Sequence, residues 1–332
     1  MADDIYSPDP LMTGETIEGW VMNKCEDWRD YFESNHESDF DEYYRLWRGM
    51  WDPADRERAS ERSRIISPAL QQAVESNVAE IEEATFGRGK WFDIADDMGD
   101  TNKQDILYLR KKLTEDFEQC KVRKAVAECL INAAVFGTGI GEISIEEIKE
   151  MAPATQPIMD GQLQAVGVTI TDRVVVKLKP IMPQNFLIDP VATSVEDAMG
   201  VAVDEFVSRH HVELLQEQGV YADAPVANAA PDTDLEPDQD LTIYNDDKVR
   251  LTKYYGLVPR QLLVDAYDDE VEEESMYVEA IVVIANGGVL LKAEPNPYMM
   301  KDRPVVAFPW DVVPGRFGDA VFARKDIILR KH

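Results

Sequence analysis

Acidic side chains at alternate positions are the first candidates for chemistry in this sequence. Within the acidic segment 231–247 they follow the spacing of a calcium-binding EF-hand loop. They are Asp232, Asp234 and Glu236. However, the sixth position of that loop is Pro237, where a glycine must permit the turn, and the twelfth is Ile243, where a bidentate glutamate is needed. We therefore expect this segment and a second acidic segment, 268–274, to be solvated loops rather than metal sites.

The candidate residues for metal ligation and acid–base catalysis are not spaced so that they could act together. His210 and His211 are adjacent, so on a helix they lie about 100° apart and cannot hold one ion from one face. Glu128 and Glu142 stand in apolar stretches of the kind that suit acid–base roles, but we expect both to be partly exposed. The sequence therefore indicates no catalytic, cofactor-binding or metal-ligating residue, no cofactor, and no enzymatic activity.

Three glycines at alternate positions, Gly137, Gly139 and Gly141, have a superficial likeness to a phosphate-binding loop. They follow an expected helix and precede an expected strand. A phosphate loop has the opposite order, because the N-terminus of the helix after it must face the phosphate. A helix-to-strand turn is the better interpretation.

The cysteines indicate a reducing environment. Cys25, Cys120 and Cys129 are odd in number and lack metal-ligand spacing, and the last two lie within an expected helix. We expect buried, reduced thiols rather than a disulfide.

Composition indicates a folded and strongly acidic protein. The chain has 332 residues, 45% of them hydrophobic, enough for one large core or two to three ordinary ones. Its 34 basic and 64 acidic residues give a formal net charge of −30, which argues against tight, sequence-specific DNA binding. Segment 1–10 lacks the features of a signal peptide, and no run reaches the roughly 20 apolar residues that cross a bilayer. We expect a soluble protein.

The elements that must position these residues begin with helices. Periodicity is helical over 15–136. One helix is expected after an N-cap at Ser38, because five aromatic residues fall on one face. They are Phe40, Tyr43, Tyr44, Trp47 and Trp51. Such a face predicts burial.

Two further helices are expected before residue 138. The first has Ser67 as N-cap, Pro68 at its first position and a stop at Gly87. Its apolar stripe is Leu70, Val74, Val78 and Ile81. The other is expected to be the longest, running without interruption from about Thr101 to a stop at Gly137.

Beyond residue 138 the period shortens to that of strands. Segment 141–179 predicts a β-meander with a hairpin loop around 153–161. Asn286-Gly287-Gly288 predicts a tight hairpin, and 208–218 a short helix. Later strands are expected at 253–258, 276–284 and 289–293. The predicted fold class is α+β, with N-terminal helices followed by a mostly antiparallel, β-rich region.

Several stretches in a fixed order carry a family resemblance. They are 62–94, 134–140, 183–198, 208–221, 253–260 and 303–317. Together they resemble portal proteins, the head-to-tail connectors of tailed double-stranded-DNA phages, and most closely those of short-tailed phages. By this resemblance 1–37 is an N-terminal arm, 38–139 the helical part of the portal wing, and 140–317 its β-rich part. Segment 318–332 is then the start of a stem or a truncated end, because similar portals continue into stem helices and a clip.

The resemblance implies a structural subunit of a dodecameric ring at one capsid vertex. The implied partners are further copies of the chain, the major capsid protein and scaffold, the terminase motor, a head-to-tail adaptor or tail protein, and double-stranded DNA passing without sequence specificity. The implied location is the virion, after assembly in the host cytoplasm. An acidic channel would let DNA slide, since it makes few phosphate contacts. Two alternatives stay open: another virion assembly protein, such as an adaptor or scaffold, and an acidic metal-dependent hydrolase.

Overall fold

A computed structural model of the chain describes most of its length. The described residues are 15–50, 68–87, 89, 91–94, 103–157, 163–227, 248–267, 275–298 and 300–310, with the backbone alone described over 147–157 and 163–172. Both acidic segments, Trp51 and the C-terminal segment 318–332 lie outside this part of the chain, so the expectations for them stay predictions. The predicted cap at Ser67 is wrong: the helix begins at Ala69 with Pro68 as its N-cap, because the carbonyl of Pro68 already accepts a hydrogen bond from the backbone N–H of Gln72.

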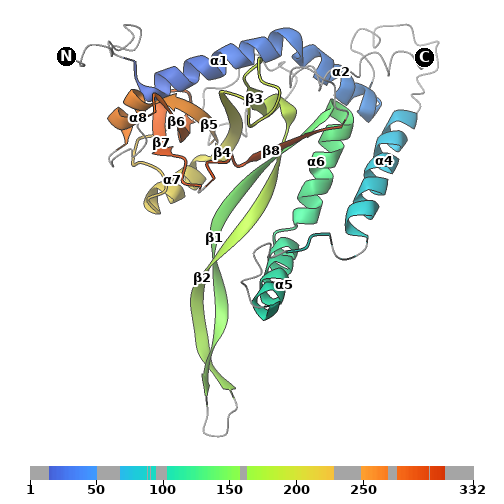
Figure 1. The fold of residues 1–332 in the computed structure, drawn as a ribbon, viewed down its shortest axis with the longest axis vertical. Helices are drawn as coiled ribbons and strands as arrows, with labels where there is room; N and C mark the ends of the chain where they lie inside the picture. The colour runs from blue at the N-terminus through green and yellow to red at the C-terminus, as the bar shows by residue number, and fades with distance from the viewer. Residues whose placement is uncertain are drawn as a thin grey trace.

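Helices come first and two antiparallel sheets follow, which confirms the α+β class (Figure 1). The N-terminal helices are α1 (Ile17–Asn35), α2 (Glu37–Arg48), α4 (Ala69–Phe86), α5 (Lys103–Gln119) and α6 (Val122–Phe136). The first strands are β1 (Thr138–Pro157), β2 (Leu163–Ile181), β3 (Phe186–Ile188) and β4 (Gly200–Ser208). The remaining elements are α7 (Arg209–Glu217), β5 (Lys248–Pro259), α8 (Arg260–Ala266), β6 (Tyr277–Ala285), β7 (Val289–Pro295) and β8 (Val305–Pro309). The strand order is β2-β1-β8 in a three-stranded sheet and β3-β4-β5-β6-β7 in a five-stranded one.

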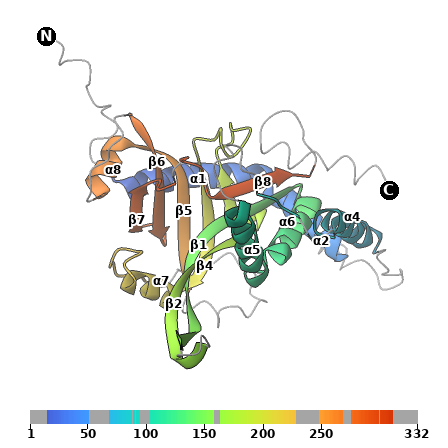
Figure 2. The same ribbon diagram turned by 60° about the horizontal axis from the view of Figure 1, so that its bottom comes forward.

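A long β-hairpin dominates the outline of the molecule. Strands β1 and β2 are 20 and 19 residues long and pair in one register from Ile140↔Ile181 to Ala154↔Gly167. The predicted antiparallel pairing over 141–179 is confirmed, but the loop expected around 153–161 is too long, because β1 continues to Pro157 and β2 begins at Leu163. The hairpin projects away from the five-stranded sheet and beside α5 and α6 (Figures 1 and 2).

Helix α1 covers one face of the five-stranded sheet. Its N-cap, Thr16, accepts a hydrogen bond from the backbone N–H of Gly19. Trp28 stacks on Tyr254 of β5 with ring centroids 6.1 Å apart, and Trp20 meets the same ring edge-on. Residues of the predicted arm 1–37 therefore contribute one face of a helix to the core, since the buried residues of α1 and of the sheet form one cluster.

The five-stranded sheet is buried on both faces. Val201 and Val203 of β4 belong to the cluster on one face, while Ala202 belongs to the cluster under α1. The same alternation separates Tyr254 from Tyr255 in β5. Successive strand side chains point to opposite faces, so each strand contributes to two cores.

A third core lies among the helices. Phe40 and Tyr43 of α2 are buried against α4 and α6, and the Phe40 ring meets Phe136 edge-on at 5.3 Å. The predicted aromatic face is confirmed there, although Tyr44 is 40% exposed. Ser38 is not the N-cap. Helix α2 starts at Glu37, because the carbonyl of His36 already accepts hydrogen bonds from the backbone of residues 39 and 40.

The predicted single long helix from Thr101 to Gly137 is wrong. Helices α5 and α6 are separate, and Lys121 between them has a left-handed backbone with φ 54°. Arg173 of β2 forms an ion pair with Asp116 near the end of α5 and so ties that helix to the hairpin. The break between the two helices contains neither glycine nor proline. The helical periodicity of the sequence therefore continues across it and predicted one helix.

The predicted turns are confirmed. Gly137 ends α6 with φ 96° and β1 starts at the next residue, as expected for a helix-to-strand turn. Asn286 and Gly287 have φ 49° and 72°, the left-handed pair that a tight hairpin requires. Helix α7 and its stop at Gly219 are also confirmed. Helix α8 was not predicted from the sequence. It begins at Arg260, directly after β5 ends at Pro259.

Candidate functional site

Four charged side chains meet where the hairpin rests on the five-stranded sheet. Glu142 of β1 and Lys179 of β2 are direct cross-strand partners. Glu205 of β4 and Lys253 of β5 lie on the face of the five-stranded sheet that also carries Val203 and Tyr255. We call Glu142, Lys179, Glu205 and Lys253 the charge quartet.

Lys253 is the centre of the charge quartet. Its Nζ lies 3.1 Å from each carboxylate oxygen of Glu142 and 3.1 Å from Oε2 of Glu205. The other oxygen of Glu205 pairs with Nζ of Lys179. Tyr255 donates a hydrogen bond of 2.7 Å from its hydroxyl to Oε1 of Glu142. Acids and bases thus alternate along a continuous chain of contacts.

Glu142 is 3% exposed, so the prediction that it is partly exposed is wrong. The sequence could not show that β1 would lie over β5 at this residue, because the two belong to different sheets. The prediction for Glu128 holds. It lies on α6 with its side chain 46% exposed and its carboxylate 3.3 Å from Lys124.

The ionisation of the charge quartet follows from its contacts. Burial alone would lower the pKa of Lys253, but the carboxylates of Glu142 and Glu205 outweigh it, and the pKa lies above its ordinary value. Burial would raise the pKa of Glu205, yet Lys253 and Lys179 hold it below its usual range. Burial, reinforced by Glu142, raises the pKa of Tyr255 well above 10. Both shifts favour the charged forms of Lys253 and Glu205, which contact one another.

A second cluster of polar side chains, centred on the carboxylate of Asp204, lies on the opposite face of the five-stranded sheet, beneath α1. Asp204 accepts hydrogen bonds from Arg29 at 2.8 Å, from Arg250 at 2.6 Å and from Thr252 at 2.7 Å. Burial would raise the pKa of Asp204, but hydrogen bonding and attraction from Arg250 outweigh it, and the pKa lies below its ordinary value. The cluster joins α1 to β4 and β5.

The buried thiol of Cys25 lies close to this second cluster. Burial, with a contribution from the Asp204 carboxylate, raises the pKa of Cys25 to about 12. The prediction of buried, reduced thiols holds for Cys25 and Cys129, while Cys120 is partly exposed at the break after α5. All three cysteines are free.

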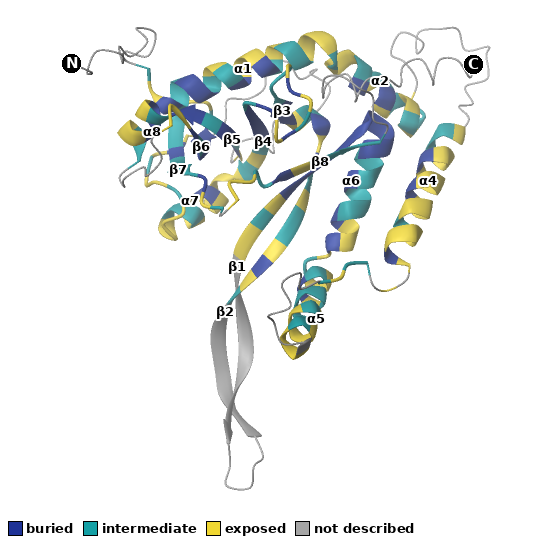
Figure 3. Ribbon diagram, viewed as in Figure 1, coloured by how far each residue is buried: buried dark blue, intermediate teal, exposed yellow. Residues whose placement is uncertain are grey.

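Exposed apolar side chains gather on the hairpin and on α5. Ile145 and its cross-strand partner Val176 are 55% and 36% exposed, and Val174, next along that face, is 57% exposed. On α5, Leu107 and Tyr108 are 59% and 72% exposed. Figure 3 shows these exposed stretches near the start of the hairpin and along α5. Such side chains are typical of a surface that another molecule covers.

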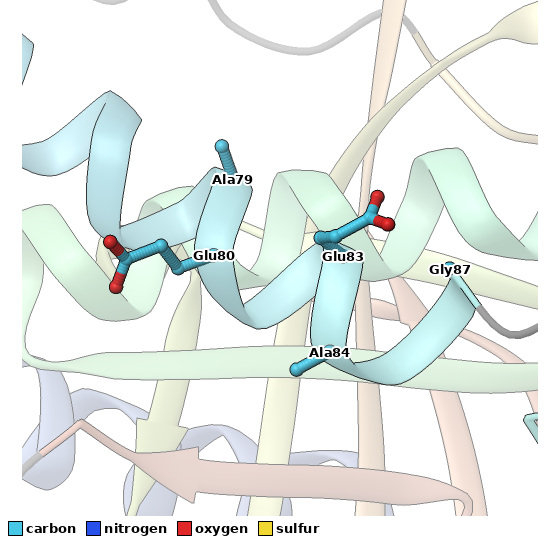
Figure 4. A pocket seen from close by; sticks show the side chains of 5 residues that line it. All are labelled: Ala79, Glu80, Glu83, Ala84 and Gly87. Atoms are coloured by element: carbon cyan, nitrogen blue, oxygen red, sulfur yellow. The ribbon is translucent and has the colours of Figure 1, made fainter.

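A shallow hollow lies on the outer face of α4 (Figure 4). Its lining residues are Ala79, Glu80, Glu83, Ala84 and Gly87. The carboxylates of Glu80 and Glu83 point away from one another. The hollow therefore lacks the converging carboxylates that acid–base catalysis or cation binding requires.

The other residues considered from sequence are scattered. His210 and His211 lie on the exposed surface of α7, as expected. Among the described residues there is no group of three or more histidine, cysteine, aspartate or glutamate side chains that could hold a metal ion. Within that same part of the chain, no helix has both the length and the apolar character to cross a membrane.

The residues that sequence reasoning missed are Lys179, Glu205, Lys253 and Asp204. A signal exists for Glu205, Lys253 and Asp204, because each is a charged residue at a strand position whose neighbours two residues away are apolar. Lys179 has no such signal, since Lys177 is one of those neighbours. That signal becomes useful only when the strand pairing is known. Comparisons with protein-family models and with curated proteins give no match to this sequence.

Proposed function

We propose that the chain is a portal-type ring subunit of a tailed double-stranded-DNA phage, acting structurally in DNA packaging and ejection. The observation that carries the proposal is the ordered series of portal-like stretches across 62–317. Several of these stretches fall where one element passes into the next: 134–140 at the α6–β1 turn, 208–221 at the β4–α7 junction, and 253–260 at the β5–α8 junction. Junctions between elements need specific backbone geometry. Sequence similarity at a junction is therefore less often accidental than similarity inside a helix.

The surface of the subunit supports this proposal. Apolar side chains of the hairpin and of α5 are exposed to solvent in the single chain, and a neighbouring subunit would cover them. The net charge of −30 suits a channel through which DNA slides, because acidic side chains repel the phosphates. Further copies of the chain, capsid and scaffold proteins, terminase, and an adaptor or tail protein are the partners that the proposal requires.

The first test is the particle mass of the purified chain, with negative-stain images, at low and moderate salt. Rings of about twelve subunits with a central hole would support the proposal. If the chain stays monomeric, the full product of its source gene is measured in the same way. Monomers in both cases would contradict the proposal.

A different virion assembly protein, such as an adaptor or scaffold, is the second candidate, because the exposed apolar surface fits that role equally well. The number of subunits and a central hole wide enough for double-stranded DNA distinguish the two candidates in the same images.

The hydrolase alternative needs a separate test. Phosphoester or peptide hydrolysis that requires Mg²⁺ or Mn²⁺ and disappears on replacing one aspartate would overturn the structural assignment.

A further inference from the structure

We propose that the charge quartet is an orientation device: it determines the direction in which the β1–β2 hairpin projects from the five-stranded sheet. The inference is independent of the proposed function, because it concerns the fold of a single chain.

Side-chain contacts matter between the two sheets, because no strand of one pairs with a strand of the other among the described residues. Arg303, just before β8, pairs with Glu279 of β6, but the hairpin itself is tied to the sheet elsewhere. Backbone hydrogen bonds fix strand direction within each sheet but not between the two. Between the sheets, Ile140 and Ile181 at the start of the hairpin join the apolar cluster of the five-stranded sheet. Apolar contact is non-directional, so it holds the hairpin down without fixing its angle.

The charge quartet adds direction where the hairpin itself meets the sheet. The hairpin presents one acid and one base side by side, Glu142 and Lys179. The sheet presents Glu205 and Lys253, and each hairpin charge meets its opposite. Turning the hairpin about its contact would place Glu142 near Glu205 and Lys179 near Lys253. Like charges in a partly buried setting repel strongly, so only one orientation is compatible with the quartet.

The hydrogen bond from Tyr255 makes the contact more selective. Its hydroxyl and the Lys253 ammonium together give the Glu142 carboxylate three hydrogen bonds. A rotated hairpin would leave this carboxylate buried without them, which is costly. On the same hairpin, the pair Glu146–Lys177 is a contrast, because its side chains are 49% and 37% exposed and both belong to the hairpin itself. That pair cannot orient the hairpin on the sheet.

The test measures the distance between two spin labels by double electron–electron resonance. The labels are placed on the hairpin and on α7 through Val174→Cys and His211→Cys, both at exposed positions, with Cys120→Ser removing the partly exposed thiol. Labelled chain is diluted with unlabelled chain, so that contacts between copies do not contribute. We expect one narrow distance distribution for the otherwise unchanged protein.

Exchanging the hairpin charges is the decisive variant. Glu142→Lys with Lys179→Glu keeps net charge and cross-strand pairing but places like charges against the sheet, and we expect the distribution to broaden or move by several ångströms. Adding Glu205→Lys and Lys253→Glu restores the match, and we expect the narrow distribution to return. The control, Glu146→Gln, should leave it unchanged.

Isosteric Glu142→Gln covers the case in which the exchanged variants fail to fold. It removes the charge and keeps the shape, and we expect a broadened distribution together with faster amide exchange over 140–146, while amides of β6 stay protected. A distribution as narrow as that of the parent protein in the hairpin exchange or in Glu142→Gln would overturn the proposal. Equal loss of protection in the hairpin and in β6 would also overturn it, because the quartet would then hold the core rather than the hairpin direction.

Discussion

Asp204 and Glu205 are neighbours in β4, and their carboxylates serve opposite faces of one sheet. Asp204 ties α1 to the sheet through Arg29 and Arg250, while Glu205 joins the charge quartet under the hairpin. Both carboxyl groups have pKa values below their ordinary range, because cationic partners outweigh the effect of burial. At the scale of single residues, the folded state therefore favours the ionised forms of these two carboxylates.

Acid should destabilise the protein through these two groups. A carboxyl whose pKa is lowered in the folded state contributes stability fully above its unfolded pKa of about 4, and that contribution is lost as pH falls through the lower folded value. We expect the free energy of unfolding to drop below about pH 4 and Asp204→Asn to flatten that dependence. Urea unfolding followed between pH 2.5 and 7 measures it. The same acid dependence in wild type and Asp204→Asn would contradict the assignment.

The cysteines should differ in reactivity. Cys25 and Cys129 are buried, and burial raises their pKa values to about 12 and about 11, so both thiols stay protonated at pH 8. Iodoacetamide should therefore modify Cys120 first in the folded protein and reach the other two only after unfolding. Peptide mass mapping after timed alkylation checks the order, with a urea-unfolded sample as the control. Early modification of Cys25 in folded protein would be the contrary result.

At the scale of elements, helix α2 shows how one aromatic face divides between core and surface. Phe40 is 1% exposed and contacts Phe136, whereas Tyr44, on the same predicted face, is 40% exposed. The helical period placed both on one side, but only packing against α4 and α6 decided which is covered. Partly covered Trp47 lies between these extremes.

Alanine substitutions in α2 should reflect that division. We expect Phe40→Ala to lower the free energy of unfolding by about 3–5 kcal/mol, because it leaves a cavity in the helical core. Tyr44→Ala, the matched control, should cost less than about 1 kcal/mol. Chemical denaturation of both variants measures the difference. Equal costs would show that the third core does not centre on Phe40.

At the scale of the whole molecule, two features define the surface of the single chain. The hairpin projects from the five-stranded sheet, and apolar side chains on it and on α5 are open to water (Figures 1 and 3). The charge quartet holds the hairpin in a defined direction. A fixed arm with an apolar surface is well suited to contact another subunit, in line with the ring proposal.

Replacing that apolar surface should affect association and not folding. Ile145→Ser combined with Val174→Ser removes two side chains that are 55% and 57% exposed. We expect the melting temperature to change by less than about 2 °C, since surface substitutions are nearly neutral. Mass measurements should show fewer assembled particles than in the wild type. Unchanged assembly would place the subunit contacts elsewhere, and Glu146→Gln on the opposite face is the control.

Local patterns in the sequence were sufficient for part of this structure. They predicted the α+β class, the turn at Gly137, the hairpin at Asn286-Gly287 and helix α7, because helical and strand periods and glycine backbone freedom act over a few residues. The net charge of −30 follows directly from the sequence. The recognition of a portal protein and the function drawn from it stay a proposal.

Tertiary structure alone decided the rest. The break at Lys121 carries no local signal, and the full length of the hairpin depends on pairing between residues far apart in the chain. Glu142 was expected to be partly exposed but is buried by contacts with Lys253 and Tyr255, which are more than a hundred residues away in the chain. The charge quartet depends on which strands meet, and long-range packing determines that where local periodicity cannot.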